Sequence, residues 1–177
     1  ALKPFNPSMG LMLESTRPQL YAVGGPHEFA PSKRPRVRLR TIELAGELRV
    51  PFTTGILIGI GEDRQDRIES LFAIRRLHER FGQVQEVIIQ NFRAKPATPM
   101  EDARDAETED LMWSVAAARL ILGPDANVQV PPNLSSDNYQ VYLDAGINDW
   151  GGVSPLTIDF VNPEAPWPAL RELRDRT

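Results

Sequence analysis

Cysteine is absent from this sequence of 177 residues, and histidine occurs only twice. Without cysteine the chain can form no disulfide, offer no thiol nucleophile and supply no thiolate ligand to zinc or to an iron-sulfur cluster. Long hydrophobic runs are also missing. The longest, at residues 52–60, is broken by threonine and glycine and falls far short of the roughly 20 residues of a membrane span. We therefore expect no membrane partner and a cytoplasmic location.

A strongly basic balance is missing as well. Twenty Lys and Arg against 24 Asp and Glu give a formal net charge of -4, and binding to nucleic acid calls for a basic surface, so we expect no nucleic-acid partner. With 41% hydrophobic and 25% charged residues, the composition suits one globular unit over residues 1–177. The chain opens at Ala1 without the basic and apolar regions of a secretory signal, and we expect it to be a piece of a longer protein.

Apolar runs and helical periodicities alternate along the chain. Strands are predicted at residues 8–14, 50–60, 86–92 and 127–130. Helices are predicted at 37–46, from a cap at Asp63 to a stop at Gly82, at 108–122, at 137–145 and over 170–173, with a short strand or loop at 148–155. The alternation predicts an α/β fold with a parallel sheet covered by helices, either doubly wound or part of a β/α barrel.

In both architectures, ligands gather at the C-terminal ends of the strands. A long irregular connection at residues 16–36, of a kind that is usually functional inside a compact domain, follows the first strand. The residues that end or follow the strands are therefore the candidate site: Glu14, 59–62, 91–95, Asn133 and 148–152.

The octet GILIGIGE at residues 55–62 ends the second strand. Its glycines would let a flat ligand approach the backbone, and the helix that follows would offer its N-terminus. The octet lacks the third glycine of GxGxxG, which argues against a Rossmann dinucleotide site. Close packing of strand against helix, with Glu62 as a first-turn acid, explains the same residues without any ligand.

Glu14 and Arg38 form a second candidate. A carboxylate at a strand end could bind the hydroxyl groups of a ligand, and a guanidinium in the next helix could bind a carboxylate through two parallel hydrogen bonds. The alternative is a solvated Glu14 and a surface arginine among Arg34, Arg36 and Arg40.

Polar residues at the remaining strand ends allow two interpretations each. Arg93 and Lys95 could bind an anion or cover apolar surface with their stems. Asp149 and Trp150 could place an acid and an aromatic plane near a strand end, or the tryptophan could simply be buried against a tight turn. His27, in a glycine-rich loop, could be an acid/base group, but a lone loop histidine is more often exposed to solvent, and we expect this for His27.

The octet matches the GxIxGxxE pattern of the radical S-adenosylmethionine enzymes, with Leu57 where the pattern has Ile. Further segments resemble the FO synthase family, the deazaflavin branch of these enzymes: LESTRPQLY, RLRTIELAG, VPFTTGILIGIGE, QNFRAKPATPM, NVQVPPNLS and DAGINDWGGVSPLTIDFVNPEAPWP. The resemblance covers essentially the whole chain. NFRAKPATPM and DWGGVSPLTIDFVNPEAPWP are its most specific parts.

The resemblance implies a TIM-barrel-like (β/α) domain that uses a 4Fe-4S cluster to cleave S-adenosylmethionine into methionine and a 5'-deoxyadenosyl radical. The family closes the 5-deazaflavin ring of FO, the coenzyme F420 precursor. Its substrate is a tyrosine-derived adduct of 5-amino-6-ribitylaminouracil, and ammonia is released.

The same resemblance implies roles for individual residues. Glu14 resembles the residue that touches the ribose hydroxyls, and Arg38 the arginine that pairs with the methionine carboxylate. Contacts to the adenine and methionine are implied for Leu57, Gly59, Glu62, Asn91 and Phe92. The implied candidates for substrate contacts are Arg93, Asn133 and Asp149.

This chain departs from the family because it lacks the CxxxCxxC loop that holds the cluster. The resemblance therefore implies the later strands and helices of the barrel, with the cluster ligands in a missing N-terminal half and no metal ligand in this chain. The companion radical S-adenosylmethionine half of FO synthase is a further expected partner. The alternative is a non-catalytic nucleotide-binding or partner-docking α/β module, in which the octet merely packs.

Overall fold

The computed structural model describes residues 3–135, 138–154 and 156–177. One parallel sheet runs in the order β1-β2-β3-β4, built from Met9–Gly10, Phe52–Ile58, Val84–Asn91 and Asn127–Gln129. The α-helices are α1 (Pro35–Glu47), α2 (Arg64–Phe81), α3 (Thr108–Leu122), α4 (Tyr139–Ala145) and α5 (Leu170–Asp175). Short 3-10 turns are η1 (Lys3–Phe5), η2 (Pro18–Tyr21), η3 (Pro31–Lys33) and η4 (Pro132–Leu134).

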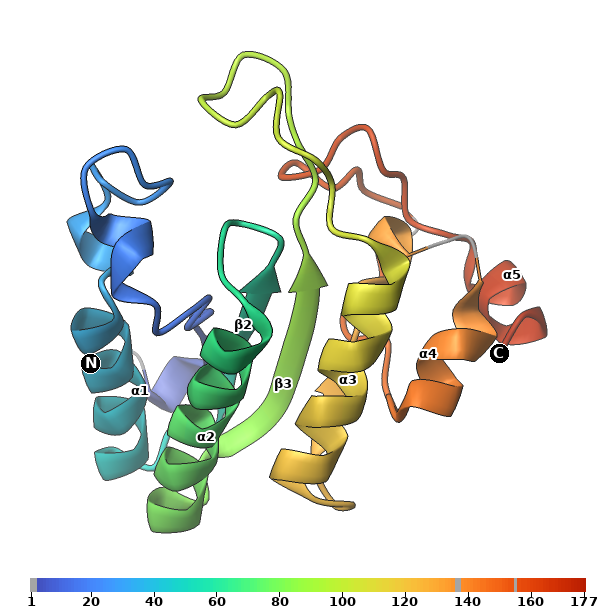
Figure 1. Cartoon of the computed structure of the whole chain (residues 1–177). Coiled ribbons are helices and arrows are strands. Elements are labelled where there is room, and N and C mark those ends of the chain that lie inside the picture. Colours follow the sequence, from blue (N-terminus) through green and yellow to red (C-terminus); the bar gives the residue numbers. More distant parts are fainter. Residues whose placement is uncertain (1–2, 136–137, 155) are drawn as a thin grey trace.

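The strand order confirms the predicted α/β fold with a parallel sheet. Strands adjacent in the sequence are adjacent in the sheet, with α1, α2 and α3 in the three crossovers. In Figure 1 these three helices lie side by side in front of β2 and β3, and α2 contacts both α1 and α3. A doubly wound sheet reverses its order at a switch point, whereas successive strands of a β/α barrel do not. The order therefore favours part of a barrel over a doubly wound sheet.

The two faces of β3 differ in burial. Val87 and Ile89, which alternate along the strand, are buried in the core beneath the helices. Glu86, Ile88 and Gln90 point to the other face and are only partly buried. A sheet with helices on one face and a half-open second face has the geometry of an arc of a barrel, whose inner face other strands would complete.

The ends of α2 follow directly from the sequence. Asp63 caps the helix by accepting a hydrogen bond from the backbone N–H of Asp66, and the Asp66 side chain accepts one from the Asp63 N–H in return. Gly82 ends the helix at φ 68°, a left-handed conformation that glycine adopts without steric cost. The predicted cap and stop are both confirmed, as is the helix predicted over residues 108–122.

The first strand is shorter than the predicted 8–14. Regular pairing covers Met9–Gly10, and the ladder is interrupted where the Leu13 N–H donates to the Thr54 side chain. Pairing with β2 resumes at Glu14 as a single bridge to Ile56. The side-chain hydrogen bond replaces one rung of the ladder, and periodicity alone does not reveal this.

Other boundaries differ by a few residues. α1 begins at Pro35 because proline suits the first helical position, and β2 ends at Ile58 because Gly59 turns the chain at φ 91°. The segment predicted as a short strand or loop at 148–155 is a loop over its described residues, with one bridge between Gln129 and Asp149. The predicted helix start at 137 and residue 155 lie outside the described residues. Within the described ranges, no helix is long and apolar enough to cross a bilayer.

Candidate functional site

Three connections gather at the C-terminal end of the sheet, at the top of Figure 1. They are the loop after β1 (residues 15–34), the loop after β3 (residues 92–107) and the segment after α4 (residues 146–169), called here the tail. Their side chains line cavities near the ends of β2 and β3. This is the end of the sheet at which the sequence places the candidate site.

Glu14 lies at the centre of a buried cluster of basic side chains. Its carboxylate accepts a hydrogen bond from Arg38 Nη1 at 3.0 Å and lies 3.1 Å from Lys33 Nζ. His27 Nε2 is 3.0 Å from the second carboxylate oxygen. The backbone of Glu14 is held at φ 65°, in the left-handed region, by hydrogen bonds to Gly55 and Leu57 on β2. Three basic partners and a strained backbone fix this carboxylate in one position.

The surroundings of Glu14 keep its side chain charged. Burial alone would raise the pKa of this carboxyl group. The hydrogen bond from His27 and the charges of Arg38 and Lys33 outweigh burial, and together they lower the pKa of Glu14 from 4.5 to about 2. Glu14 is therefore an ionised hydrogen-bond acceptor at neutral pH.

Arg38 lies inside the fold, so the alternative of a surface arginine is wrong for this residue. It is 7% exposed, and it donates hydrogen bonds to the backbone carbonyls of Met12 and Ser32 as well as to Glu14. The neighbouring Arg36 and Arg40, by contrast, are exposed. The structure brings the two candidates Glu14 and Arg38 into direct contact.

The expectation for His27 is wrong. Its side chain is 5% exposed, its backbone N–H donates to Leu20, and its ring contacts Tyr21 at 5.3 Å between centroids. Loop residues are usually solvated, but His27 is buried because its ring contacts the carboxylate of Glu14. Sequence reasoning also missed Lys33 as a partner of Glu14, because nothing in the local pattern marks a loop lysine as an ion-pair partner across 19 residues.

The pKa of Glu14 leads to a pH-dependent prediction. A carboxylate with a folded pKa near 2 and an unfolded pKa near 4.5 stabilises the fold fully above pH 4.5, and this contribution is lost as the pH falls toward 2. Glu14→Gln should therefore lower the free energy of unfolding at neutral pH, and its difference from the wild type should shrink below about pH 4. Urea unfolding across this range measures it. Glu69→Gln, at an exposed site on α2, is the control, and a difference that stays constant with pH would contradict the prediction.

The turn at residues 59–62 is held by the Glu62 side chain. Glu62 accepts hydrogen bonds from the backbone N–H groups of Gly59 and Ile60, and from Arg67 Nε at 2.8 Å. The Glu62 side chain is 1% exposed. At Gly59 a Cβ would lie 2.8 Å from the Cβ of Ala106, so only glycine fits this position. The buried Glu62 carboxylate therefore fixes the conformation of this turn by binding its backbone N–H groups.

The largest opening at this end, called here the central cavity, has a volume of about 700 Å³. The loop after β1 contributes Phe29, and the strand ends contribute Leu57, Asn91 and Phe92. Its lining is mainly apolar, and Asn91 adds a buried amide whose Oδ1 has no hydrogen-bond partner among the described residues. A flat ligand with a hydrogen-bond donor at its edge fits this combination.

The candidate residues for S-adenosylmethionine therefore fall into three adjoining groups. The first is the ionised Glu14 with Arg38, and the second is the turn containing Gly59 and Glu62. The third, which lines the central cavity, consists of Leu57, Asn91 and Phe92. An ionised acceptor for hydroxyl groups, a guanidinium and an apolar cavity with an unpaired amide oxygen suit the ribose, the carboxylate and the adenine of such a cofactor.

A second opening, called here the tail cavity, lies between the loop after β3 and the tail and has a volume of about 490 Å³. Arg93 lines both cavities, and its guanidinium donates to Asp105 at 3.0 Å and to the Leu134 carbonyl at 2.7 Å. Asn133 lines the tail cavity. Two of the three substrate candidates thus meet at one opening.

The third substrate candidate, Asp149, is engaged in its own turn. Its carboxylate accepts hydrogen bonds from Gln129 Nε2 and from the backbone N–H of Gly151, and it lines neither cavity. Trp150 packs edge to face against Tyr139 at 5.0 Å between ring centroids. For Asp149 and Trp150, a tryptophan packed against a tight turn therefore fits the structure better than a contact to a ligand.

The tail carries residues that sequence reasoning did not single out. Asp159 accepts hydrogen bonds from the backbone N–H groups of Val161 and Asn162 and from the side chain of Asn133. Asn162 in turn accepts a hydrogen bond from Lys95 Nζ at 2.8 Å. The motif DFVNPEAPWP could have signalled this role, because its polar residues fold the tail over the strand ends.

Metal binding finds no support within the described part of the chain. No group of three or more His, Asp or Glu side chains there could hold a metal ion. The sequence contains no cysteine for a cluster.

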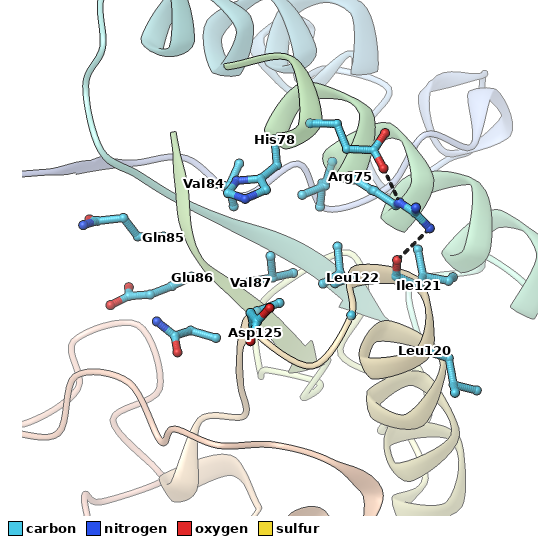
Figure 2. A pocket seen from close by; sticks show the side chains of 15 residues that line it. Arg75, His78, Val84, Gln85, Glu86, Val87, Leu120, Ile121, Leu122 and Asp125 are labelled. Atoms are coloured by element: carbon cyan, nitrogen blue, oxygen red, sulfur yellow. Dashed lines mark hydrogen bonds and ion pairs between the residues drawn. The ribbon is translucent and has the colours of Figure 1, made fainter. Parts of the chain in front are cut away.

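A further hollow, of about 470 Å³, lies at the opposite end of the sheet. Figure 2 shows it between the start of β3 and the ends of α2 and α3, with Val84 and Leu122 among its lining residues. Arg75 spans its edge by donating to Glu79 and to the Ile121 carbonyl. Because ligands of parallel sheets gather at the other end, this hollow does not belong to the candidate site.

Comparison with known proteins identifies the relatives of the chain. It is 58% identical over 176 residues to 7,8-didemethyl-8-hydroxy-5-deazariboflavin synthase of Methanopyrus kandleri. The alignment covers 99% of this chain and 52% of that protein. The chain is similar to FO synthases over nearly its whole length. FO synthase of Streptomyces coelicolor is 58% identical over 173 residues, and that of Mycobacterium tuberculosis 55% over 174. Each alignment covers 97% of this chain and 20% of the FO synthase.

The chain thus spans about half the length of the Methanopyrus FO synthase relative and about a fifth of the other two. No protein-family model matches it. Among solved structures, an endocellulase of Pyrococcus horikoshii is similar with a TM-score of 0.38 and 15% identity, covering 92% of this chain and 49% of that one. The sequence resemblance to FO synthase is confirmed by these relatives.

Proposed function

We propose that this chain is part of an FO synthase, contributing the later strands and helices of its radical S-adenosylmethionine barrel. The complete enzyme closes the 5-deazaflavin ring of FO from a tyrosine-derived adduct of 5-amino-6-ribitylaminouracil, with release of ammonia. The observation that carries this proposal is 58% identity across 99% of the chain to a protein named for that product. The sequential strand order supports a barrel segment.

Within this function, the chain binds and orients the cofactor. Glu14 accepts hydrogen bonds from the ribose hydroxyls, and Arg38 donates to the methionine carboxylate. Leu57 and Phe92 enclose the adenine, and Asn91 accepts a hydrogen bond at its edge. S-adenosylmethionine, together with a reduced 4Fe-4S cluster, supplies the 5'-deoxyadenosyl radical that abstracts hydrogen.

The turn at residues 59–62 contributes shape to this site. The Glu62 carboxylate accepts its hydrogen bonds from Gly59, Ile60 and Arg67, so its role is to hold the turn in place beside the cofactor. The cluster ligands come from the rest of the longer protein, which acts in the cytoplasm together with the companion half of FO synthase.

Two measurements test the proposal together. The complete protein that contains this chain, reduced and supplied with S-adenosylmethionine and the tyrosine-derived adduct of 5-amino-6-ribitylaminouracil, should form FO and 5'-deoxyadenosine. Formation of neither product by a protein with a full cluster would instead favour a non-catalytic module.

This chain alone, reconstituted with iron and sulfide, should bind no cluster because it has no thiolate ligands. The expected spectrum lacks the broad visible absorbance of a 4Fe-4S cluster and shows no iron retained after desalting. Iron and sulfide bound in proportion to the chain would contradict this prediction. The complete protein treated in the same way is the positive control.

A further inference from the structure

Asn133 presents an unpaired acceptor at the tail cavity. Its side-chain nitrogen donates one hydrogen bond to Asp159 Oδ2 at 3.0 Å and one to the Ala165 carbonyl at 3.1 Å, so both N–H groups are used. Its Oδ1 has no partner among the described residues, and the residue is 7% exposed. A buried amide oxygen without a donor is unfavourable, and a ligand that brings one would relieve this.

The charges around the tail cavity indicate what kind of ligand it takes. Three carboxylates line it, but Asp105 is paired with Arg93, and Glu172 is paired with Arg176 at 3.1 Å. Only Glu164 has no ion pair among the described residues. The carboxylate of Glu164 therefore disfavours an anionic ligand in this cavity. Its polar lining is dominated by acceptors, with Arg93 as the main donor.

A neutral chain of hydroxyl groups fits this lining. Each hydroxyl can donate to an amide or carboxylate oxygen and can also accept from a guanidinium. Trp167 lines the same cavity and offers a flat apolar surface for the C–H edges of such a chain.

The position of Arg93 connects this cavity with the central one. Because Arg93 lines both, a ligand in the tail cavity can extend past its guanidinium toward the end of β3. A ligand with a hydroxylated chain at one end and a ring at the other would place its ring near the central cavity, beside the residues assigned to the cofactor.

We propose that the tail cavity binds the polyhydroxylated chain of the substrate, with Asn133 Oδ1 and Glu164 accepting hydrogen bonds from its hydroxyl groups. This inference rests on the proposed function, since it assigns one part of that substrate to residues of this chain. Asn133 and Glu164 thereby become specificity-determining residues that distinguish a substrate with the chain from one without it.

The test compares two ligands and measures binding by calorimetry on the complete protein. The ligands are 5-amino-6-ribitylaminouracil and the analogue in which a methyl group replaces the ribityl chain. Asn133→Leu and Glu164→Leu should each weaken binding of the ribityl ligand roughly fivefold to tenfold and leave the affinity of the methyl analogue unchanged. Glu109→Leu, at a side chain 87% exposed on α3, is the control and should change neither affinity.

The two leucine variants separate recognition from folding. Asn133→Leu also removes the hydrogen bonds to Asp159 and Ala165 and loosens the tail, whereas the Glu164 side chain makes no such bond to any described residue. Equal weakening of both ligands by Glu164→Leu, or an unchanged preference for the ribityl ligand in both variants, would overturn the proposal. Tighter wild-type binding of an analogue with an aminoalkyl chain would overturn it in favour of a cation site.

Failure of the proposed function gives a different result. If the complete protein makes no FO while the variants still lose their preference for the ribityl chain, the reaction is misassigned and the binding site stands. If FO is formed and the preference is unaffected, only the tail cavity is misassigned.

Discussion

Glu62→Ala is expected to lower the free energy of unfolding by about 3 kcal/mol, a large effect for a single substitution. The carboxylate is 1% exposed and accepts hydrogen bonds from Gly59, Ile60 and Arg67. Alanine would leave two backbone N–H groups without their partner and the buried Arg67 without its closest carboxylate. Arg67 keeps Asp110 at 3.2 Å, which places the cost at the lower end of the range for a broken buried ion pair.

Glu69→Ala provides the matched control for this substitution. Glu69 is exposed on α2 and accepts a hydrogen bond only from Gln65, one turn earlier, so its replacement should change stability by less than about 0.5 kcal/mol. Chemical denaturation of the complete protein and of both variants measures the difference. If the two alanine variants unfold at the same denaturant concentration, Glu62 does not hold the turn.

Arg38→Lys in the complete protein is expected to weaken binding of S-adenosylmethionine by about tenfold to a hundredfold, or about 1.5 to 3 kcal/mol. Nε and Nη1 of Arg38 already donate to Ser32, Met12 and Glu14, which leaves Nη2 to donate to the methionine carboxylate. An ammonium has three N–H groups on one nitrogen and cannot keep all of these hydrogen bonds at once. Arg38 is already oriented by Met12, Ser32 and Glu14, so its direction is fixed before any ligand arrives.

Arg36→Lys and Arg40→Lys are the controls for Arg38→Lys. Both arginines lie on the same helix, make the same contribution to net charge and are exposed. Titration of S-adenosylmethionine by calorimetry gives the three affinities, and a thermal melt of each variant shows whether folding is intact. Equal affinities in three folded variants would remove Arg38 from the binding site.

The arrangement of helices and strands could largely be read from local patterns. The helix capped by Asp63 and ended by Gly82 is present as predicted, because capping and left-handed termination depend on residues within one turn. The strand at 52–58 follows from its continuous apolar run. The first strand could not be bounded in the same way, because the hydrogen bond from Leu13 to Thr54 joins residues 41 apart in the sequence.

The candidate site was only partly accessible from the sequence. Glu14, Asn91 and Asn133 could be placed at strand ends, because parallel strands bring their C-terminal ends to one edge. The partners of Glu14 could not be predicted, since His27 and Lys33 belong to an irregular loop whose path depends on the whole fold. The expectation that His27 is exposed failed for this reason.

The sequence by itself determined the α/β alternation, the absence of thiolate ligands and the resemblance to FO synthase, because each depends on residue identity and local order. Only the tertiary structure decided that Arg38 is buried against Glu14 and that the Glu62 carboxylate binds the backbone of its own turn. It also decided that Asn133 Oδ1 has no hydrogen-bond partner among the described residues. Hydrogen bonds and burial depend on the atoms that the fold brings together. Those atoms come from elements tens of residues apart, beyond the reach of any local pattern.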